Sequence, residues 1–237
     1  MADSQIIRYY RTNLLRGRSM ESSGLSKKTI IILIIILAIA ASGFIWSIYG
    51  GTNQGHRRAI TGLKDPIQTE ATGSEQRSVN GYDVTIHYLY NYDIDALVVS
   101  THNYSGTGID DKLSSKDVAL AWGPVAEYNE LIDFHWSQSG RWYRWQANSY
   151  KEIEKVGGIE GVTQHSSNNH LIAADNSVKR QIRKIKTGDE VHLTGYLVNI
   201  DGSRSDGATF WWYTSTTRSD SGDGSCEVFY VTNVEIK

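Results

Sequence analysis

The chain has 237 residues, of which 40% are hydrophobic and 21% are charged, and its formal net charge at pH 7 is −2. This composition is ordinary for a folded protein and excludes a largely disordered chain. The only cysteine, Cys226, excludes an internal disulfide and allows only pairing between two copies in a homo-oligomer. A hydrophobic core must therefore hold the fold.

Residues 29–49, TIIILIIILAIAASGFIWSIY, contain no charged side chain. As a helix this segment would be roughly 31 Å long, which is enough to cross the hydrocarbon core of a lipid bilayer. Trp46 and Tyr49 stand where interfacial aromatic residues lie in membrane helices. The run is too long, and begins too late in the chain, for a cleaved signal peptide. We therefore predict a single-pass transmembrane helix in contact with the lipid bilayer.

Basic residues flank this segment unequally, because six precede it and only Arg57, Arg58 and Lys64 follow it closely. The excess predicts that residues 1–28 form a cytoplasmic tail and that the rest of the chain faces outward. In a Gram-negative bacterium the protein would then sit in the inner membrane with a periplasmic C-terminal domain. Residues 50–80 are rich in Gly, Thr, Ser and charges, which predicts a flexible spacer.

Residues 81–237 are predicted to form the extracytoplasmic domain, and their pattern is typical of β-strands. The predicted strands cover residues 82–90, 96–104, 117–123, 189–200, 208–216 and 226–237, with a hairpin over 132–146. Residues 175–185 predict a helix that Asp175, Asn176 or Ser177 caps. We expect a mainly β domain with one or two helices and mostly antiparallel strands. The wording GDEVHLTGYL resembles OB-like barrels, and an open sandwich is the alternative.

The predicted hairpin has two unlike faces if residues 137–140 form a four-residue loop. One face is apolar and predicts core; it carries Ile132, Phe134, Trp136, Tyr143 and Trp145. The other face is a candidate binding surface with a cross-strand pair of Asp133 and Arg144; it carries Asp133, His135, Trp142 and Arg144.

Cys226 has two interpretations. As the first residue of a strand whose core side continues with Val228 and Tyr230, it is a small buried apolar residue. As a nucleophile, it would need a base and an orienting group, for which His170 and Asn169 are the candidates. The spacing favours the first interpretation, because it is not diagnostic of any cysteine hydrolase.

The sequence predicts neither metal nor cofactor. The loop RSDSGDG departs from the calcium-loop pattern, and His165 and His170 lack a convincing third zinc ligand. Phosphate-loop and dinucleotide motifs are absent from the sequence. Residues 175–186 are basic, but residues 50–237 carry 18 basic and 24 acidic side chains, which disfavours a nucleic-acid partner.

Several stretches, DVALAWGPV, FHWSQSGRWYRW, HSSNNHLIAAD and TSTTRSDSGDGSCEVFYV, resemble in order and wording an uncharacterised family of bacterial single-pass membrane proteins. The family has a Trp-Gly motif, an Asn-Asn-His-Leu segment and an ending Ser/Thr-Thr-Arg-x-Asp-x-Gly-x-Gly-x-Cys-Glu. The matching positions are Trp122, Gly123, Asn168, Asn169, His170, Arg218, Asp220, Gly222, Gly224, Cys226 and Glu227. The resemblance implies no activity.

The motif residues predict a structural latch. Arg218 can pair with Asp220 or Glu227 and so hold the loop before the last strand. Asn168 or Asn169 is expected in a left-handed turn or at a helix cap.

Together these observations predict a non-enzymatic binding or assembly module of the cell envelope. Its partner would be an envelope protein, for instance in a secretion, pilus or conjugation apparatus. The alternative is a periplasmic cysteine-dependent hydrolase that uses Cys226 and His170.

Overall fold

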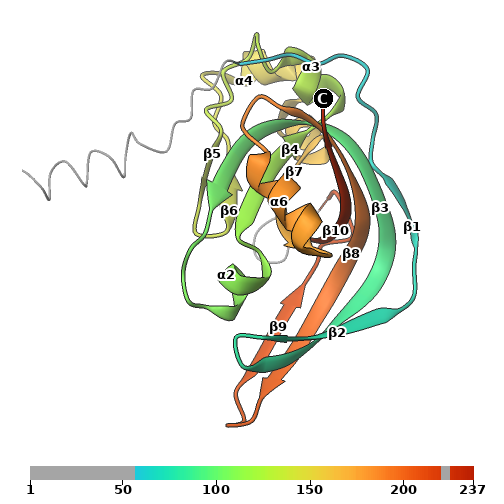
Figure 1. The fold of residues 1–237 in the computed structure, drawn as a ribbon. Helices are drawn as coiled ribbons and strands as arrows, with labels where there is room; N and C mark the ends of the chain where they lie inside the picture. The colour runs from blue at the N-terminus through green and yellow to red at the C-terminus, as the bar shows by residue number, and fades with distance from the viewer. Residues whose placement is uncertain (1–56, 220–224) are drawn as a thin grey trace, which may run out of the picture. The chain divides into compact units, whose positions relative to one another are not determined.

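β-strands dominate the computed structural model, which describes residues 57–219 and 225–237 within one compact unit, Tyr49–Lys237 (Figure 1). The strands are β1 Ile67–Glu70, β2 Ser74–Val79, β3 Tyr82–Asn103, β4 Lys116–Ala121, β5 Ser137–Ser139, β6 Trp142–Arg144, β7 Ser166–Ala173, β8 Glu190–Arg204, β9 Thr209–Tyr213 and β10 Glu227–Ile236. The helices are α2 Ile109–Leu113, α3 Gly123–Tyr128, α4 Tyr150–Ile153, the 3-10 turn η1 Glu154–Val156, α5 Gly158–Gln164 and α6 Asn176–Lys184.

The main sheet has eight strands. Its path of paired strands is β1-β3-β4-β7-β10-β8-β9, with β2 paired to β3 and an additional pairing between β3 and β8. Strands β3, β4, β7, β10 and β8 therefore each have a neighbour on both edges. Every pairing is antiparallel except that of β7 with β10, which is parallel. The expectation of a mainly β, mostly antiparallel domain is confirmed.

Strand β3 is one continuous strand of 22 residues, whereas the sequence predicted separate strands over 82–90 and 96–104. The intervening residues, NYDID, look like a turn because they are polar. Tyr92 and Ile94 nevertheless alternate with polar neighbours and lie in the core, so the strand period continues through them. Shifts in register at Tyr88/Tyr90 and Val98/Ser100 let the long strand change its partners.

The predicted spacer is wrong between residues 67 and 79, where β1 and β2 pair with β3. Both strands are polar because each has a sheet neighbour on one edge only and both are largely exposed. The expected number of helices is also wrong, since five α-helices occur among the described residues. Four of these have only four to seven residues, too few for a helical period to show in the sequence.

Helix α6 is confirmed close to its predicted bounds. The carboxylate of Asp175 accepts hydrogen bonds from the backbone N–H groups of Ser177 at 2.6 Å and Val178 at 2.9 Å, which caps the helix. Val178 and Ile182 face a core cluster that includes residues of β3, β4, β7, β8 and β10. Its C-terminus is also anchored, because Nζ of the buried Lys116 donates to the carbonyl of Ile185 at 2.5 Å.

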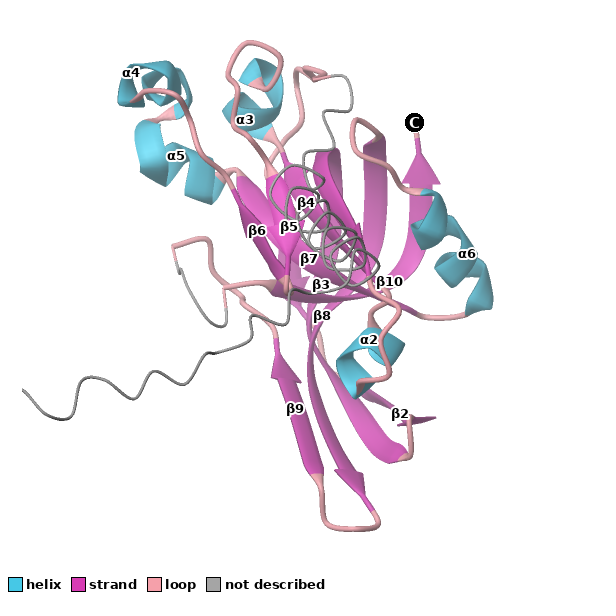
Figure 2. Ribbon diagram, turned by 90° about the vertical axis from the view of Figure 1, so that its left-hand side faces the viewer, coloured by secondary structure: helices cyan, strands magenta, loops and turns pink. Residues whose placement is uncertain are grey.

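Three short helices and the arm of outer strands lie at opposite ends of the sheet. Helices α3, α4 and α5 gather at one end, while β2, β9 and the adjoining parts of β3 and β8 extend as an arm at the other (Figure 2). The inner side of this arm is apolar and includes Val84, Ile86 and Ile200. Its outer side is mostly polar.

Candidate functional site

The polar segment SSNNH lies on β7, a buried strand between β4 and β10. No strand was predicted here, since a fully buried strand is normally apolar. The expectation that Asn168 or Asn169 occupies a left-handed turn or caps a helix is therefore wrong. Because side chains alternate along a strand, β7 presents two different sets of polar groups to its two faces.

The first set, here called the thiol cluster, consists of Asp117, Asn168, His170 and Cys226. Asp117 on β4 lies directly opposite His170 on β7. Asn169 pairs in parallel with Glu227, so Asn168 lies level with Cys226, the residue just before β10. Asp117, Asn168 and His170 are almost completely buried, and Cys226 is half-buried. The fold thus brings Cys226 and His170 together, as the hydrolase hypothesis requires.

His170 lies between a carboxylate and the thiol. Its Nδ1 is 2.9 Å from Oδ2 of Asp117, which leaves Nε2 as the ring nitrogen available to Cys226. Burial by itself would lower the pKa of His170, but hydrogen bonds to Asp117 and Cys226 outweigh burial and raise this pKa to about 9. The imidazole is therefore charged at neutral pH.

The Asn168 side chain has its amide orientation fixed by its neighbours. Its Oδ1 accepts a hydrogen bond from Nε2 of the buried Gln138 at 2.6 Å. Its Nδ2 donates to the carbonyl of Arg141 at 2.9 Å and to Sγ of Cys226 at 3.4 Å. An N–H donor is thus held beside the sulfur.

Arg141 is the second cation beside Asp117. It donates from Nη1 to Oδ1 of Asp117 at 2.9 Å and from Nη2 to the carbonyl of Ser114 at 2.9 Å, and it also pairs with Asp111. Its guanidinium stacks over the ring of Tyr104 at 3.6 Å. Each oxygen of the buried Asp117 carboxylate therefore meets a different cation, which compensates its loss of hydration.

Arg141 reaches this position because it lies in the turn between β5 and β6. The turn has only two residues, Gly140 and Arg141, with φ values of 59° and 70°. Two-residue hairpins of this kind need positive φ at both positions, which a non-glycine residue adopts at a cost. The ion pairs and ring contact of Arg141 offset that cost.

The predicted four-residue loop over 137–140 is therefore wrong. Arg144 pairs with Ser137 rather than with Asp133, so the register differs from the expected one by four residues. An even difference keeps each side chain on its expected face. The apolar face is core as predicted, since Ile132 and Phe134 are buried and the partners Trp136, Tyr143 and Trp145 pack with them.

The other hairpin face lacks the expected cross-strand pair. Asp133 pairs with Arg57 at 3.2 Å, and Arg144 donates instead to Oγ of Ser139 at 2.9 Å, so the expected pair of Asp133 and Arg144 is wrong. The backbone N–H of the exposed His135 donates to Asp133 at 3.2 Å, and Trp142 is half-buried opposite Ser139.

On the opposite face of the sheet from the thiol cluster, Glu227 of β10 belongs to a group that we call the latch: Arg218, Glu227, Tyr92 and Trp122. Arg218 donates from Nη1 to Glu227 and from Nη2 to the hydroxyl of Tyr92. Its guanidinium lies 5.2 Å from the ring centre of Trp122. Burial raises the pKa of Tyr92 to about 12, although Arg218 opposes this, so the hydroxyl stays protonated. Of the two predicted partners, Glu227 pairs with Arg218, and Asp220 lies outside the described residues.

The Trp-Gly motif joins this region to α3. Trp122 is buried and donates from Nε1 to Asp65 at 3.0 Å. Gly123 has φ of 51°, and a Cβ there would lie 2.7 Å from Cδ2 of His165. Only glycine satisfies both demands. A pocket of about 380 Å³ is lined by Trp122, His165 and Arg218 among others.

Asn169 is not an orienting group for His170. Its side chain lies on the opposite face of β7, where Nδ2 donates to Oγ of Ser167 at 2.9 Å. Asp117 has the orienting position instead. Asp117, Gln138 and Arg141 were not predicted as site residues. Gln138 and Arg141 lie within FHWSQSGRWYRW, one of the stretches that carry the family resemblance, and this was the signal that could have indicated them.

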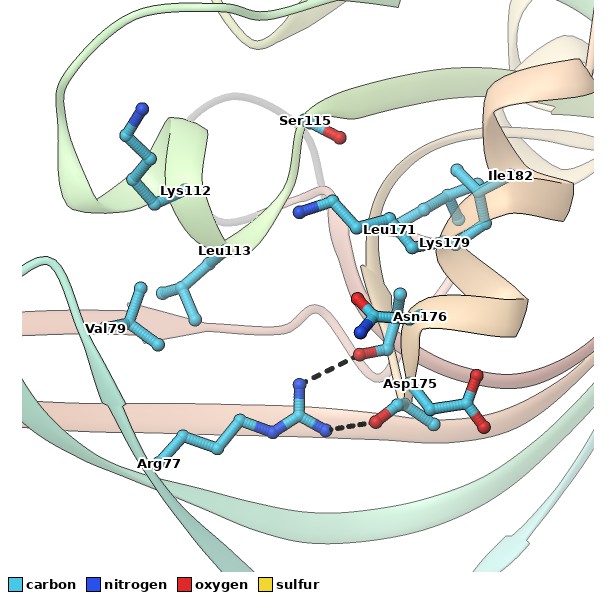
Figure 3. Close-up of a pocket in the computed structure, with 12 residues that line it drawn as sticks. Arg77, Val79, Lys112, Leu113, Ser115, Leu171, Asp175, Asn176, Lys179 and Ile182 are labelled. Atoms are coloured by element: carbon cyan, nitrogen blue, oxygen red, sulfur yellow. Dashed lines mark hydrogen bonds between the residues drawn. The ribbon is translucent and has the colours of Figure 1, made fainter.

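A second pocket, of about 330 Å³, lies between β2, α2 and the start of α6 (Figure 3). Arg77 donates from Nη1 to the carbonyl of Ala173 at 2.9 Å and from Nη2 to that of Ala174 at 2.7 Å (dashed in Figure 3). Ala173 and Ala174 lie where β7 connects to α6, so the two hydrogen bonds of Arg77 hold β2 against this connection. Lys112 and Lys179 also line the pocket.

In the described ranges 57–219 and 225–237, no three His, Cys, Asp or Glu side chains are placed to hold a metal ion. Within the same ranges no helix has the length and apolar character needed to cross a membrane; the predicted span 29–49 lies outside them. No protein-family model, curated protein or solved structure matches this chain.

The raised pKa of His170 predicts a loss of stability at alkaline pH. The pKa is about 9 in the folded state against an ordinary value of 6.5, so the stabilising charge is fully present below about pH 6.5 and is lost as the pH rises through 9. We expect the free energy of unfolding to fall by roughly 3 kcal/mol, at 1.36 kcal/mol per pKa unit. Urea unfolding of the purified chain at several pH values measures it.

The charged and titratable groups close to His170 are Asp117, Arg141, which pairs with Asp117, and the thiol of Cys226. His170→Gln should remove most of the pH dependence, and the exposed His87→Gln should leave it unchanged. Equal pH dependence in wild type and His170→Gln would show that His170 is not charged in the folded protein.

The latch predicts a large cost for removing its cation. Arg218→Ala leaves the carboxylate of Glu227, which is 1% exposed, without its partner. We expect a loss of about 3 kcal/mol in the free energy of unfolding, because an unpaired charge would remain buried. The double variant Arg218→Met/Glu227→Gln should lose less. Arg204→Ala is the matched control, since its pair with Asp206 is exposed and contributes little. Equal stability of Arg218→Ala and wild type would rule out the latch.

Proposed function

We propose that the protein is a membrane-anchored binding or assembly module of the bacterial cell envelope. In this proposal residues 29–49 span the inner membrane and the β-rich domain acts in the periplasm on an envelope protein. The sequence features that support it are the uncharged apolar run and the excess of basic residues before it. The same run and the quoted motifs support placing the chain in the uncharacterised family that it resembles.

An OB-like barrel is the proposed form of the domain. Three observations support it: the order β3-β4-β7-β10-β8 with the pairing of β8 back to β3, the parallel pair β7 and β10, and helix α6 between β7 and β8. OB-like barrels are five-stranded and bind extended ligands across their strands and flanking loops. The fold is therefore suited to binding, although fold alone does not assign function.

The observation that carries the binding role is the outer side of β9. Trp211 is 69% exposed and Tyr213 is 47% exposed, and their ring centres lie 5.7 Å apart. The alternate residues Phe210 and Trp212 face inward and pack in the arm, so the inner side already supplies the packing that holds β9. Large exposed aromatic side chains are enriched at protein interfaces.

The position of β9 indicates the kind of partner. Among the described residues β9 pairs only with β8, so its other edge is open to a further strand. An extended segment of another protein can add to such an edge through backbone hydrogen bonds while its side chains contact Trp211 and Tyr213. We propose an extended segment of an envelope protein as this partner. A membrane tether would raise the effective concentration of the domain near such partners.

Photo-crosslinking in cells that naturally make the protein tests this surface. A photoreactive residue in place of Trp211 should give one discrete adduct with another envelope protein, and one in place of the exposed Tyr150 should not. Trp211→Ala should change the free energy of unfolding by less than about 0.5 kcal/mol, because the side chain is exposed.

An adduct only between two copies of this chain would assign β9 to self-association and contradict the proposed partner. The absence of any adduct from position 211, in cells where the domain is folded, would contradict the role of β9.

A further inference from the structure

We propose that the thiol cluster is an acyl-transfer site in which Cys226 is the nucleophile, His170 the acid and base, and Asp117 the group that positions His170. This activity goes beyond the proposed binding role and does not depend on it. It would use the face of β7 that carries Asn168 and His170.

The contacts of His170 match those of a catalytic imidazole. A nucleophilic cysteine needs a base within hydrogen-bond reach and a third group that orients the base. Nδ1 of His170 lies 2.9 Å from Oδ2 of Asp117. Cys226 precedes the strand that pairs in parallel with β7, on the face of β7 that carries Asn168 and His170, and it helps to raise the pKa of His170. Arg141 in turn donates to the other oxygen of Asp117 at 2.9 Å, so the carboxylate is held in place next to the ring.

Asn168 supplies a donor where negative charge would develop. Gln138 donates to Oδ1 of Asn168 and so fixes the orientation of the amide. Nδ2, and not Oδ1, therefore faces Sγ of Cys226, at 3.4 Å. When a carbonyl carbon binds to Sγ, its oxygen becomes negatively charged close to the sulfur. A preorganised amide donor at this place stabilises that oxyanion.

A purely structural cysteine does not need these neighbours. A buried thiol packs as a small apolar residue, and β7 would then be expected to be apolar like the rest of its sheet. The strand instead buries an imidazole and a carboxamide in contact with one sulfur, and β4 adds a carboxylate, at a cost in desolvation that apolar residues avoid. Such arrangements are typical of functional sites.

The reaction that this geometry supports is hydrolysis of a small ester through a thioester. The thiolate of Cys226 attacks the ester carbonyl carbon, a carbon–sulfur bond forms, and the π electrons move to the oxygen beside Asn168. Collapse of this intermediate expels the alkoxide, which takes a proton from Nε2 of His170. Water then gives a proton to His170 and attacks the thioester carbonyl carbon. Collapse of this second intermediate breaks the carbon–sulfur bond, releases the carboxylic acid and restores the thiolate beside the protonated His170. The half-burial of Cys226 favours a small acyl group.

The test uses the purified full-length chain and p-nitrophenyl acetate as the acyl donor. We expect a burst of p-nitrophenolate and an acetyl group on Cys226 detected by mass spectrometry. His170→Gln should slow acetylation by about 100-fold or more, in the range expected for loss of acid–base catalysis. Cys226→Ser should show no burst. His165→Gln, which lies outside the thiol cluster, is the matched control and should react like wild type.

Asp117→Asn provides a readout that a structural role would not move. The rate of Cys226 acetylation should follow the titration of His170, and Asp117→Asn should move this titration to lower pH, because the hydrogen bond to Asp117 raises the pKa of His170. Circular dichroism shows whether each variant is folded. If a variant fails to fold, the proposal is tested on the wild-type chain alone. Its rate of acetylation in buffer, where it is folded, is compared with its rate in denaturant.

The proposal is overturned if native Cys226 reacts no faster than it does in the denatured chain. It is also overturned if folded His170→Gln is acetylated at the wild-type rate. Because this assay contains no protein partner, its failure leaves the role of β9 untouched.

Discussion

The arrangement described here depends on one buried charge, the carboxylate of Asp117 in the middle of β4. The side chain has no exposed surface, and an isolated carboxylate in such a place would be very costly. Two cations from distant parts of the chain compensate it, Arg141 on Oδ1 and His170 on Oδ2. This requirement explains why β7 carries a histidine in its buried centre. It also explains why a non-glycine residue occupies a left-handed position in the β5–β6 turn.

Cys226 and Glu227 link the two polar sets through the alternation of a single strand. Adjacent side chains of a strand point to opposite faces, so Cys226 joins the thiol cluster while Glu227 joins the latch. The adjacent Asn168 and Asn169 on β7 divide in the same way. The Cys-Glu pair therefore leads into the last strand. It places the thiol of Cys226 near His170 on one face and the carboxylate of Glu227 against Arg218 on the other. A change to the latch is expected to affect the thiol through the backbone between them.

Local patterns predicted the elements that have a clear period or cap. Helix α6 could be predicted because Val178 and Ile182 recur at helical spacing behind the capping Asp175. The two faces of the hairpin could also be predicted, because the error in the turn changed the register by an even number of residues. Strand β7 could not be predicted, since its buried polar residues are explained only by partners on β4 and the hairpin. The role of Asp117 was hidden for the same reason, because the two cations that pair with it lie 24 and 53 residues further along the chain.

The most direct test of this account is the pKa of His170 measured by NMR titration of its imidazole resonances in the folded chain. The account predicts a titration midpoint of about 9 and a charged ring at neutral pH, because Asp117 and Cys226 favour the charged form. It also predicts that the midpoint falls in Asp117→Asn. A midpoint at or below the ordinary value of 6.5 in the wild-type protein would contradict the account, since Asp117 would then have only one cation and Cys226 would face a neutral ring.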